Sequence, residues 1–274
     1  MKRSVDTGMT MEDLVKFEAM VRSEIDLSEI RKFYKTINVP KTITSFTSIA
    51  IERQWNDLFM WLLSEGFHST VETSSTAFKR EIKEGNLGGM KQIHRLTILP
   101  KATKDFVTTA CFTGRLHIVK WLVANGFKVD LGIYMEMLDL KHYDVYQWLW
   151  ENNLKDNDHG SEYYSLPALD GNIEFFEWAK RQGDNYQWES YYKNFIGEDA
   201  AQMGHLDLVQ WAEANGCPLH WVTCRSAFQN EQYEVLMWLI ERGYHKIEPT
   251  YDYDEDDEFT VELMMEELKK LGKM

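Results

Sequence analysis

Tryptophan recurs along this chain at intervals of about thirty residues, and this period restricts the possible folds more than any other feature. Repeat units centre on Trp61, Trp121, Trp148, Trp178, Trp211 and Trp238, which are separated by 60, 27, 30, 33 and 27 residues. The gap of 60 holds one more copy at residues 84–93, with Gln92 at the tryptophan position. A unit of this length cannot bury its apolar face alone, so the copies are expected to stack on one another.

Residues 200–216 show what one unit contains. Gly204 is expected to end a short first helix, and Leu208, Trp211 and Ala212 then recur at i, i+3 and i+4, which is typical of the apolar face of a second helix. Gly216 follows as the left-handed residue that ends many helices. Each unit therefore predicts a pair of short helices.

Three further positions repeat with the tryptophan. Five residues after it stand Gly66, Gly126, Asn153, Gly183, Gly216 and Gly243. Asparagine is the second choice for a left-handed backbone, so Asn153 is predicted to share that conformation. Seven residues before it stand Gly85, Gly114, Gly171 and Gly204, with Gln54, Lys141 and Glu231 in the other copies. Four residues before it stand Asp57, Asp144, Glu174, Asp207 and Glu234, where the dipole of the second helix favours a carboxylate.

These motifs resemble the ankyrin repeat. GRLHIVKWLVANG (residues 114–126) and GHLDLVQWAEANG (residues 204–216) are similar to the second half of that repeat, and ACFTG and AAQMG match its A-A-x-x-G. The tryptophan-rich form resembles the ankyrin arrays expanded in large DNA viruses and in other genomes of protists. The resemblance covers residues 44–243. It departs from the family in lacking the T-P-L-H motif, and several units are shorter than the family's 33 residues.

The resemblance implies an all-α, ankyrin-like helical-repeat solenoid of about seven repeats in residues 44–243, with helical caps at both ends. The expected helix pairs are 44–53 with 56–64, 74–84 with 88–96, 105–113 with 117–125, 132–140 with 144–151, 162–170 with 174–182, 195–203 with 207–215, and 222–230 with 234–242. Residues 1–43 contain two predicted helices, 11–22 and 27–37, interpreted as an N-terminal cap or a degenerate repeat. Residues 244–274 contain an acidic linker and a predicted helix, 259–271, interpreted as a C-terminal cap or a helix offered to a partner.

Composition narrows the classes of function. Asp and Glu outnumber Lys and Arg by 44 to 30, and the resulting formal net charge of −14 opposes sequence-independent binding to nucleic acid. The chain has three cysteines, too few and odd in number for a disulfide framework. Such a set favours a reducing, cytoplasmic location, which would be inside a host cell if the protein is viral. The first ten residues do not resemble a signal peptide, and no apolar run of ~18 residues predicts a membrane helix. We expect a protein that is monomeric when free and meets a protein partner.

The candidate metal and catalytic motifs are incomplete. The acidic run 252–263 fails as a calcium loop, because Asp257 replaces the required glycine and Leu263 the bidentate glutamate. Cys217, His220 and Cys224 lack an evident fourth zinc ligand. His205 stands at a position that the resemblance assigns to a structural contact, and the glycine-rich residues 85–89 follow a predicted helix rather than a strand. No metal, no cofactor and no enzymatic activity are expected.

The longest gap between anchors, 33 residues, places an insertion at residues 184–195, DNYQWESYYKNF. In the ankyrin family this is where a finger projects towards the binding face. The predicted protein-binding residues are Asp184, Tyr186, Trp188, Glu189, Tyr191 and Tyr192, since aromatic side chains are enriched at interface hot spots. An alternative for Tyr191 and Tyr192 is inward packing at the start of the next helix. The function expected is non-enzymatic protein binding; the alternatives are a structural component of a larger, viral assembly or an adaptor for host protein degradation.

Overall fold

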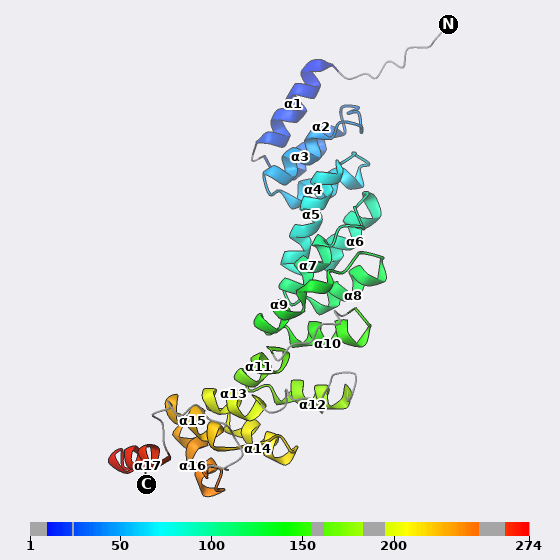
Figure 1. Cartoon of the computed structure of the whole chain (residues 1–274). Helices are drawn as coiled ribbons and strands as arrows, with labels where there is room; N and C mark the ends of the chain where they lie inside the picture. The colour runs from blue at the N-terminus through cyan, green and yellow to red at the C-terminus, as the bar shows by residue number, and fades with distance from the viewer. Residues whose placement is uncertain (1–9, 24, 155–161, 183–194, 247–260, 274) are drawn as a thin grey trace. The chain divides into compact units, whose positions relative to one another are not determined.

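A computed structural model describes residues 10–23, 25–154, 162–182, 195–246 and 261–273, and within these ranges all regular secondary structure is helical. The chain divides into two compact units (Figure 1), unit 1 from Met1 to Ile133 and unit 2 from Tyr134 to Met274. The predicted helix pairs are present, with ends that differ from the prediction by three residues or fewer. Helix α5 begins early, at Val71, because the Thr70 hydroxyl accepts a hydrogen bond from the Thr73 N–H at 3.0 Å and caps the helix there.

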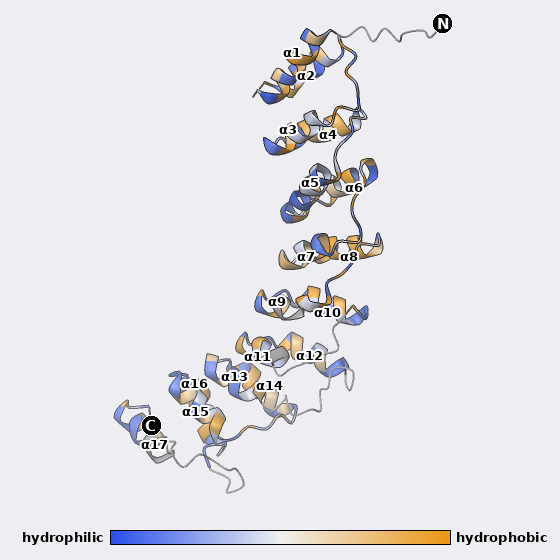
Figure 2. Cartoon of the chain, turned by 45° about the horizontal axis from the view of Figure 1, so that its top comes forward, coloured by the Kyte–Doolittle hydropathy of each residue, from blue (hydrophilic) through white to orange (hydrophobic). Residues whose placement is uncertain are grey.

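Unit 1 is a succession of antiparallel helix pairs. Each pair packs on the next through its first helix, so that α1 contacts α3, α3 contacts α5 and α5 contacts α7. Hydrophobic segments recur on the paired helices, for example on α4 and α8 (Figure 2). The helices are α1 (Met11–Arg22), α2 (Leu27–Tyr34), α3 (Ser45–Glu52), α4 (Asn56–Ser64), α5 (Val71–Glu84), α6 (Leu87–Leu96), α7 (Asp105–Phe112) and α8 (Leu116–Ala124), followed by the 3-10 turn η1 (Leu131–Ile133).

Unit 2 repeats this packing. Helix α11 contacts α9 and α13, and α13 contacts α15. The helices are α9 (Tyr134–Asp139), α10 (Tyr143–Glu151), α11 (Glu162–Leu169), α12 (Ile173–Gln182), α13 (Ile196–Met203), α14 (Leu206–Ala214), α15 (Trp221–Gln229), α16 (Tyr233–Glu241) and α17 (Val261–Lys270).

A single left-handed residue separates the two helices of every pair that matches the tryptophan repeat. The seven residues, with their φ angles, are Gln54 (56°), Gly85 (78°), Gly114 (63°), Lys141 (60°), Gly171 (67°), Gly204 (81°) and Glu231 (58°). The N–H of the next residue bonds back to the first helix in each case, as from His205 N to Ala200 O at 2.9 Å. This bond satisfies a carbonyl that the helix end would leave free. The conformation is thus general to the repeat, although only four of the seven residues are glycine.

A second left-handed residue ends most second helices. Gly66, Gly126, Asn153, Gly216 and Gly243 have φ between 56° and 87°, which confirms the prediction for Asn153. Gly183 lies outside the described residues. The copy built on Gln92 differs, because Thr97 has an extended φ of −135° at the equivalent position.

The glycine between the helices of one pair makes room for a side chain of the next pair. The residue after the left-handed position packs over the preceding pair's glycine, as the His205 ring does over Gly171. A Cβ on Gly171 would lie 2.7 Å from that ring, and His205 Nε2 is 2.9 Å from the carbonyl oxygen of Leu169. Arg115 covers Gly85 and Gln232 covers Gly204 in the same way. The structural contact expected for His205 is therefore present, and it joins neighbouring helix pairs.

Unit 1 also contains two equivalent aromatic clusters whose members stand about 60 residues apart. In one, Phe46 contacts Phe17 at 5.0 Å and Phe67 at 5.9 Å between ring centroids. In the other, Phe106 contacts Phe78 at 5.0 Å and Phe127 at 5.6 Å. Helix α1 therefore supplies its ring to α3 as α5 does to α7. This equivalence supports the degenerate-repeat interpretation of residues 11–37 over that of an unrelated cap.

The anchor tryptophans are not uniformly buried, although half-buried ones such as Trp121 and Trp211 still contact rings of the preceding pair. Trp61 and Trp178 are 8% and 4% exposed, whereas Trp121, Trp148, Trp211 and Trp238 are half-buried. Hydrogen bonding of the indole N–H does not account for the difference, because a buried and a half-buried anchor each have a glutamate acceptor. Trp178 Nε1 donates to Glu151 at 2.9 Å and Trp211 Nε1 donates to Glu177 at 2.5 Å, both on the preceding second helix.

We predict that Trp178→Ala costs about 3–5 kcal/mol of unfolding free energy, the range for large aromatic truncations in a core. Trp211→Ala should cost at least about 1 kcal/mol less, because a partly exposed ring leaves a smaller cavity. Urea unfolding of the two variants checks the difference. Equal losses would show that exposure at this position does not govern the energy.

The glycine contacts predict a graded series. Gly216 has open space around its missing Cβ, so Gly216→Ala should cost only the left-handed conformation, about 1–2 kcal/mol. Gly171→Ala should cost more, because it adds the collision with His205. In a urea-unfolding double-mutant cycle, His205→Asn should recover the excess at Gly171. No coupling between the two sites would refute the packing described.

Candidate interaction surface

The predicted binding residues Asp184, Tyr186, Trp188, Glu189, Tyr191 and Tyr192 all lie within residues 183–194, outside the described part of the chain. Their role remains a prediction, as does the choice between interface and inward packing for the two adjacent tyrosines. The acidic residues 252–258 also fall outside it. The described helices on either side of the insertion, α12 and α13, both belong to unit 2.

Charge is divided unevenly between the two units. Residues 1–133 contain 19 Lys and Arg against 15 Asp and Glu, a formal net charge of +4. Residues 134–274 contain 11 Lys and Arg against 29 Asp and Glu, a formal net charge of −18. The overall formal net charge of −14 is therefore the sum of a slightly basic unit 1 and a strongly acidic unit 2. Such an asymmetry gives each unit a different electrostatic preference for partners.

A row of carboxylates contributes to the acidity of unit 2. Each second helix carries one exposed acid in its first turn, namely Asp144 on α10, Glu174 on α12, Asp207 on α14 and Glu234 on α16. The equivalent positions of unit 1 hold Asp57, Gly88 and His117, so only one of the three is acidic. The helix dipole tolerates a carboxylate at every one of these positions but does not require it. The unbroken row is therefore a property of the unit 2 surface.

Other carboxylates of unit 2 point towards the neighbouring pair. Glu151 and Glu177 accept the indole N–H groups of Trp178 and Trp211. Glu213 accepts from the Tyr244 hydroxyl at 2.7 Å and pairs with Arg242 at 3.2 Å. Burial and the adjacent Glu213 raise the pKa of Tyr244, so its hydroxyl stays a donor. These acids hold the second helices together, which distinguishes them from the exposed row.

An open groove of about 630 Å³ lies between α10 and α12. Asp144 and Glu174 of the acidic row line it, together with Lys141 and Arg181. Asp170 stabilises the edge of the groove. Its carboxylate accepts a hydrogen bond from the Tyr143 hydroxyl at 2.5 Å and forms an ion pair with Lys141 at 2.5 Å. The groove offers polar contacts of both signs rather than an enclosed apolar pocket, so its chemistry suits a peptide or protein surface better than a buried cofactor.

The residues considered for chemistry have structural surroundings. Burial raises the pKa of the Cys111 and Cys224 thiols to about 12, which keeps them protonated and unreactive. Within the described residues no three His, Cys, Asp or Glu side chains come together as metal ligands, and Cys217, His220 and Cys224 are no exception. The glycine-rich turn is explained by Glu81, whose buried carboxylate accepts from Asn86 Nδ2 at 2.6 Å and fills the space beside Gly89.

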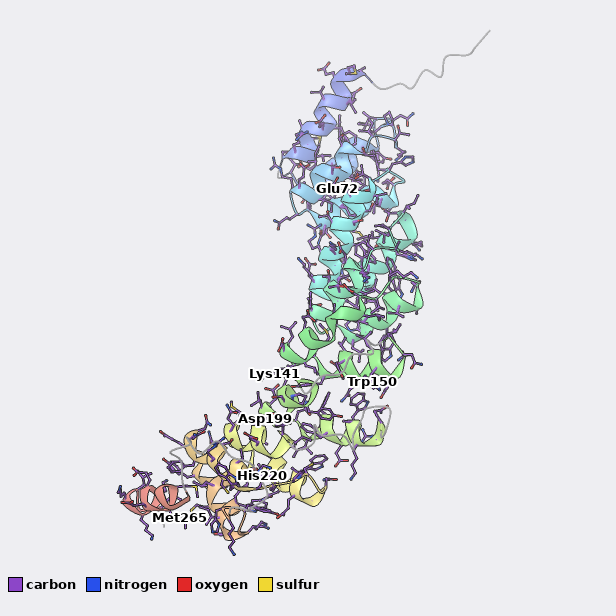
Figure 3. The ribbon with its side chains drawn as sticks, viewed as in Figure 1. Glu72, Lys141, Trp150, Asp199, His220 and Met265 are labelled. Carbon is purple, nitrogen blue, oxygen red and sulfur yellow. The ribbon has the colours of Figure 1, made fainter. Side chains whose placement is uncertain are left out.

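One acid of unit 2 has a strongly perturbed environment. Asp199 lies on α13 (Figure 3), which packs between α11 and α15. Burial raises its pKa to about 6, a hydrogen bond from Ser165 opposes the shift, and the adjacent Glu198 adds to it. Sequence reasoning had no signal for this group, because the position is polar in a helix that otherwise reads as an ordinary repeat.

The Asp199 shift predicts a pH dependence of stability. The folded state holds the proton up to about pH 6, whereas the unfolded state loses it near pH 4, so unfolding free energy should fall as pH rises through that window. Asp199→Asn should remove this fall and stabilise the chain at pH 7, while the exposed Asp144→Asn should not. Thermal melts of the three proteins from pH 4 to pH 7 test this, and parallel curves for all three would contradict it.

No described helix combines the length and the apolar character that crossing a membrane requires. No protein-family model matches the chain, and no curated protein is significantly similar to it.

Proposed function

We propose that this chain is an ankyrin-like helical-repeat solenoid that acts without catalysis, as a module that binds a basic protein partner through unit 2. The repeated helix pairs support the solenoid, since each pair packs on the next through its first helix within each unit. The recurring left-handed residues support it further, because the same two stops appear in successive copies. Repeats of this kind fix an architecture and leave recognition to surface residues.

The division of charge carries the functional part of the proposal. A unit with a formal net charge of −18 attracts a basic surface and raises its rate of encounter, and the row from Asp144 to Glu234 would present that charge along successive helices. The predicted aromatic residues 186–192 belong to the same unit and would supply the apolar anchor that charge alone lacks. Nucleic acid is disfavoured as a partner for the same electrostatic reason.

The non-catalytic assignment rests on what the reactive side chains do in the fold. His205 contacts a backbone carbonyl, Glu81 is bonded to Asn86, and the buried cysteines are held as thiols. Each group has a structural partner or surroundings that suppress its reactivity. A general base or nucleophile instead needs a substrate position within reach, and these groups point into helix contacts.

Affinity purification of the full chain with mass spectrometry tests the proposal. We expect a basic protein whose recovery decreases at higher salt and drops at least about tenfold for Glu174→Lys/Asp207→Lys, since like charges repel across an interface. Asp57→Lys, the same change at the equivalent position of unit 1, is the matched control and should retain the partner. An acidic partner, or equal loss in both variants, would contradict the assignment to unit 2.

A further inference from the structure

A groove lies in unit 1 where two similar halves, α1–α4 and α5–α8, meet at the links after α4 and α6. Within each half a backbone hydrogen bond joins neighbouring links, from His68 N to Lys41 O at 2.8 Å and from Lys128 N to Lys101 O at 3.2 Å. Between the halves, the link after α4 and the link after α6 instead border a groove of about 520 Å³. This volume is within the range of ~300–1,000 Å³ that ligand-binding clefts occupy.

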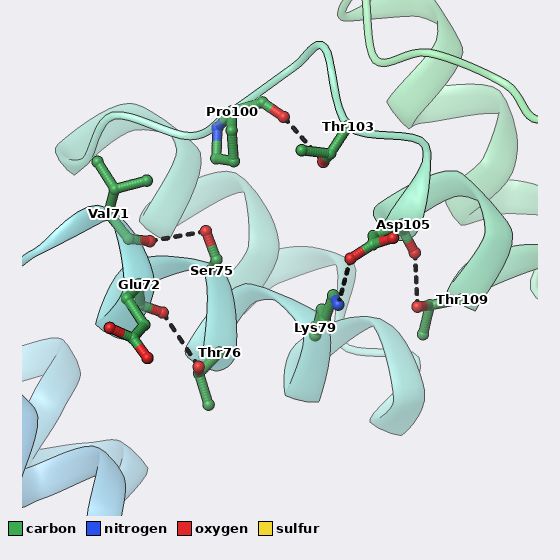
Figure 4. A network of polar contacts seen from close by, with 9 residues as sticks. All are labelled: Val71, Glu72, Ser75, Thr76, Lys79, Pro100, Thr103, Asp105 and Thr109. Atoms are coloured by element: carbon green, nitrogen blue, oxygen red, sulfur yellow. Dashed lines mark hydrogen bonds and ion pairs between the residues drawn. The ribbon is translucent and has the colours of Figure 1, made fainter.

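Three exposed apolar side chains line this groove. Ile98 is 82% exposed, Val71 51% and Leu96 38%, and all three line the groove with the buried Leu63 and Phe67. Val71 begins α5, and Figure 4 shows it with Pro100 of the link after α6. Apolar side chains gathered at one opening mark a contact surface more often than isolated exposed ones do.

The link after α6 can be compared with the link after α2, which is its equivalent in the other half of unit 1. The link after α2 has the same order of buried and exposed positions, with Val39 and Pro40 where the later link has Leu99 and Pro100. At the two exposed positions where the later link has Leu96 and Ile98, it has Thr36 and Asn38. The fold therefore accepts polar side chains at both positions. Packing within the described helices does not account for the leucine and the isoleucine.

We propose that this groove, formed by Leu63, residues 66–69, Val71 and residues 95–98, binds an apolar segment of a partner protein that also carries acidic side chains. The acidic side chains of the partner are inferred from charge complementarity. Arg95 is the one lining residue with a permanent charge, and no carboxylate lines the groove. Unit 1 also has a positive formal net charge. The preference is opposite to that of the acidic row on unit 2. This second site is thus separate from the surface assigned to the basic partner.

Selection from a random 12-residue peptide library displayed on phage, with the full chain as bait, tests the groove. Peptides enriched on the wild type but not on Leu96→Thr/Ile98→Asn should combine apolar residues with Asp or Glu, and a synthetic peptide made from them should bind the wild type. Leu96→Thr/Ile98→Asn, which copies the link after α2, should weaken that peptide at least tenfold, and Arg95→Gln at least threefold. Val15→Thr, at another exposed apolar position of unit 1, is the matched control and should leave binding unchanged.

All four substituted positions, Val15, Arg95, Leu96 and Ile98, are exposed, so melting temperatures should stay within about 2 °C of wild type and loss of fold cannot imitate loss of binding. The proposal is overturned if no peptide is enriched on the wild type over the double variant, or if the peptides enriched in this way lack acidic residues. A wild-type dimer in sedimentation that the double variant abolishes would also overturn it, since the groove would then be covered by a second copy. These outcomes leave the unit 2 test unaffected, because its variants lie outside the groove.

Discussion

A left-handed residue between the two helices of each pair that matches the tryptophan repeat is the constraint on which the rest of the fold depends. It reverses the chain in one step, lets the next N–H bond back to the first helix, and sets where the second helix begins. At three of these glycines the following pair places a large side chain over the position, namely Arg115 over Gly85, His205 over Gly171 and Gln232 over Gly204. The same residue thus shapes a pair internally and its contact with the next.

Repetition of the backbone leaves the surface free to differ between the units. The helix contacts are similar along the chain, yet the same first-turn position is acidic in every second helix of unit 2 and in only one of unit 1. Carboxylates that face neighbouring helices hold indole or hydroxyl groups, whereas those that face outward make the unit acidic. Stability and recognition therefore use the same residue types on different faces, which is why charge can vary without loss of fold.

The sequence predicted the helices well because periodicity and helix stops act locally. It predicted Asn153 for the same reason, but it missed Gln54, Lys141 and Glu231, since a long polar side chain carries no local signal for positive φ. Their conformation is imposed by the helices on both sides. Tryptophan spacing located the anchors but not their burial, which differs between copies because side chains of other repeats cover each ring to a different extent. The charge asymmetry was present in the composition and became visible only once the unit boundary was known. The unit 1 groove could not be predicted from the sequence, because its lining residues come from two links that lie far apart along the chain.

A crystal structure of the full chain, with attention to three backbone angles, tests the central claim most directly. The account predicts φ near +60° at Gln54, Lys141 and Glu231, the same turn that glycine makes in the other copies. Ordinary right-handed φ at these residues would contradict it, because the first and second helices could not then be paired as described and the repeat would not extend through those copies.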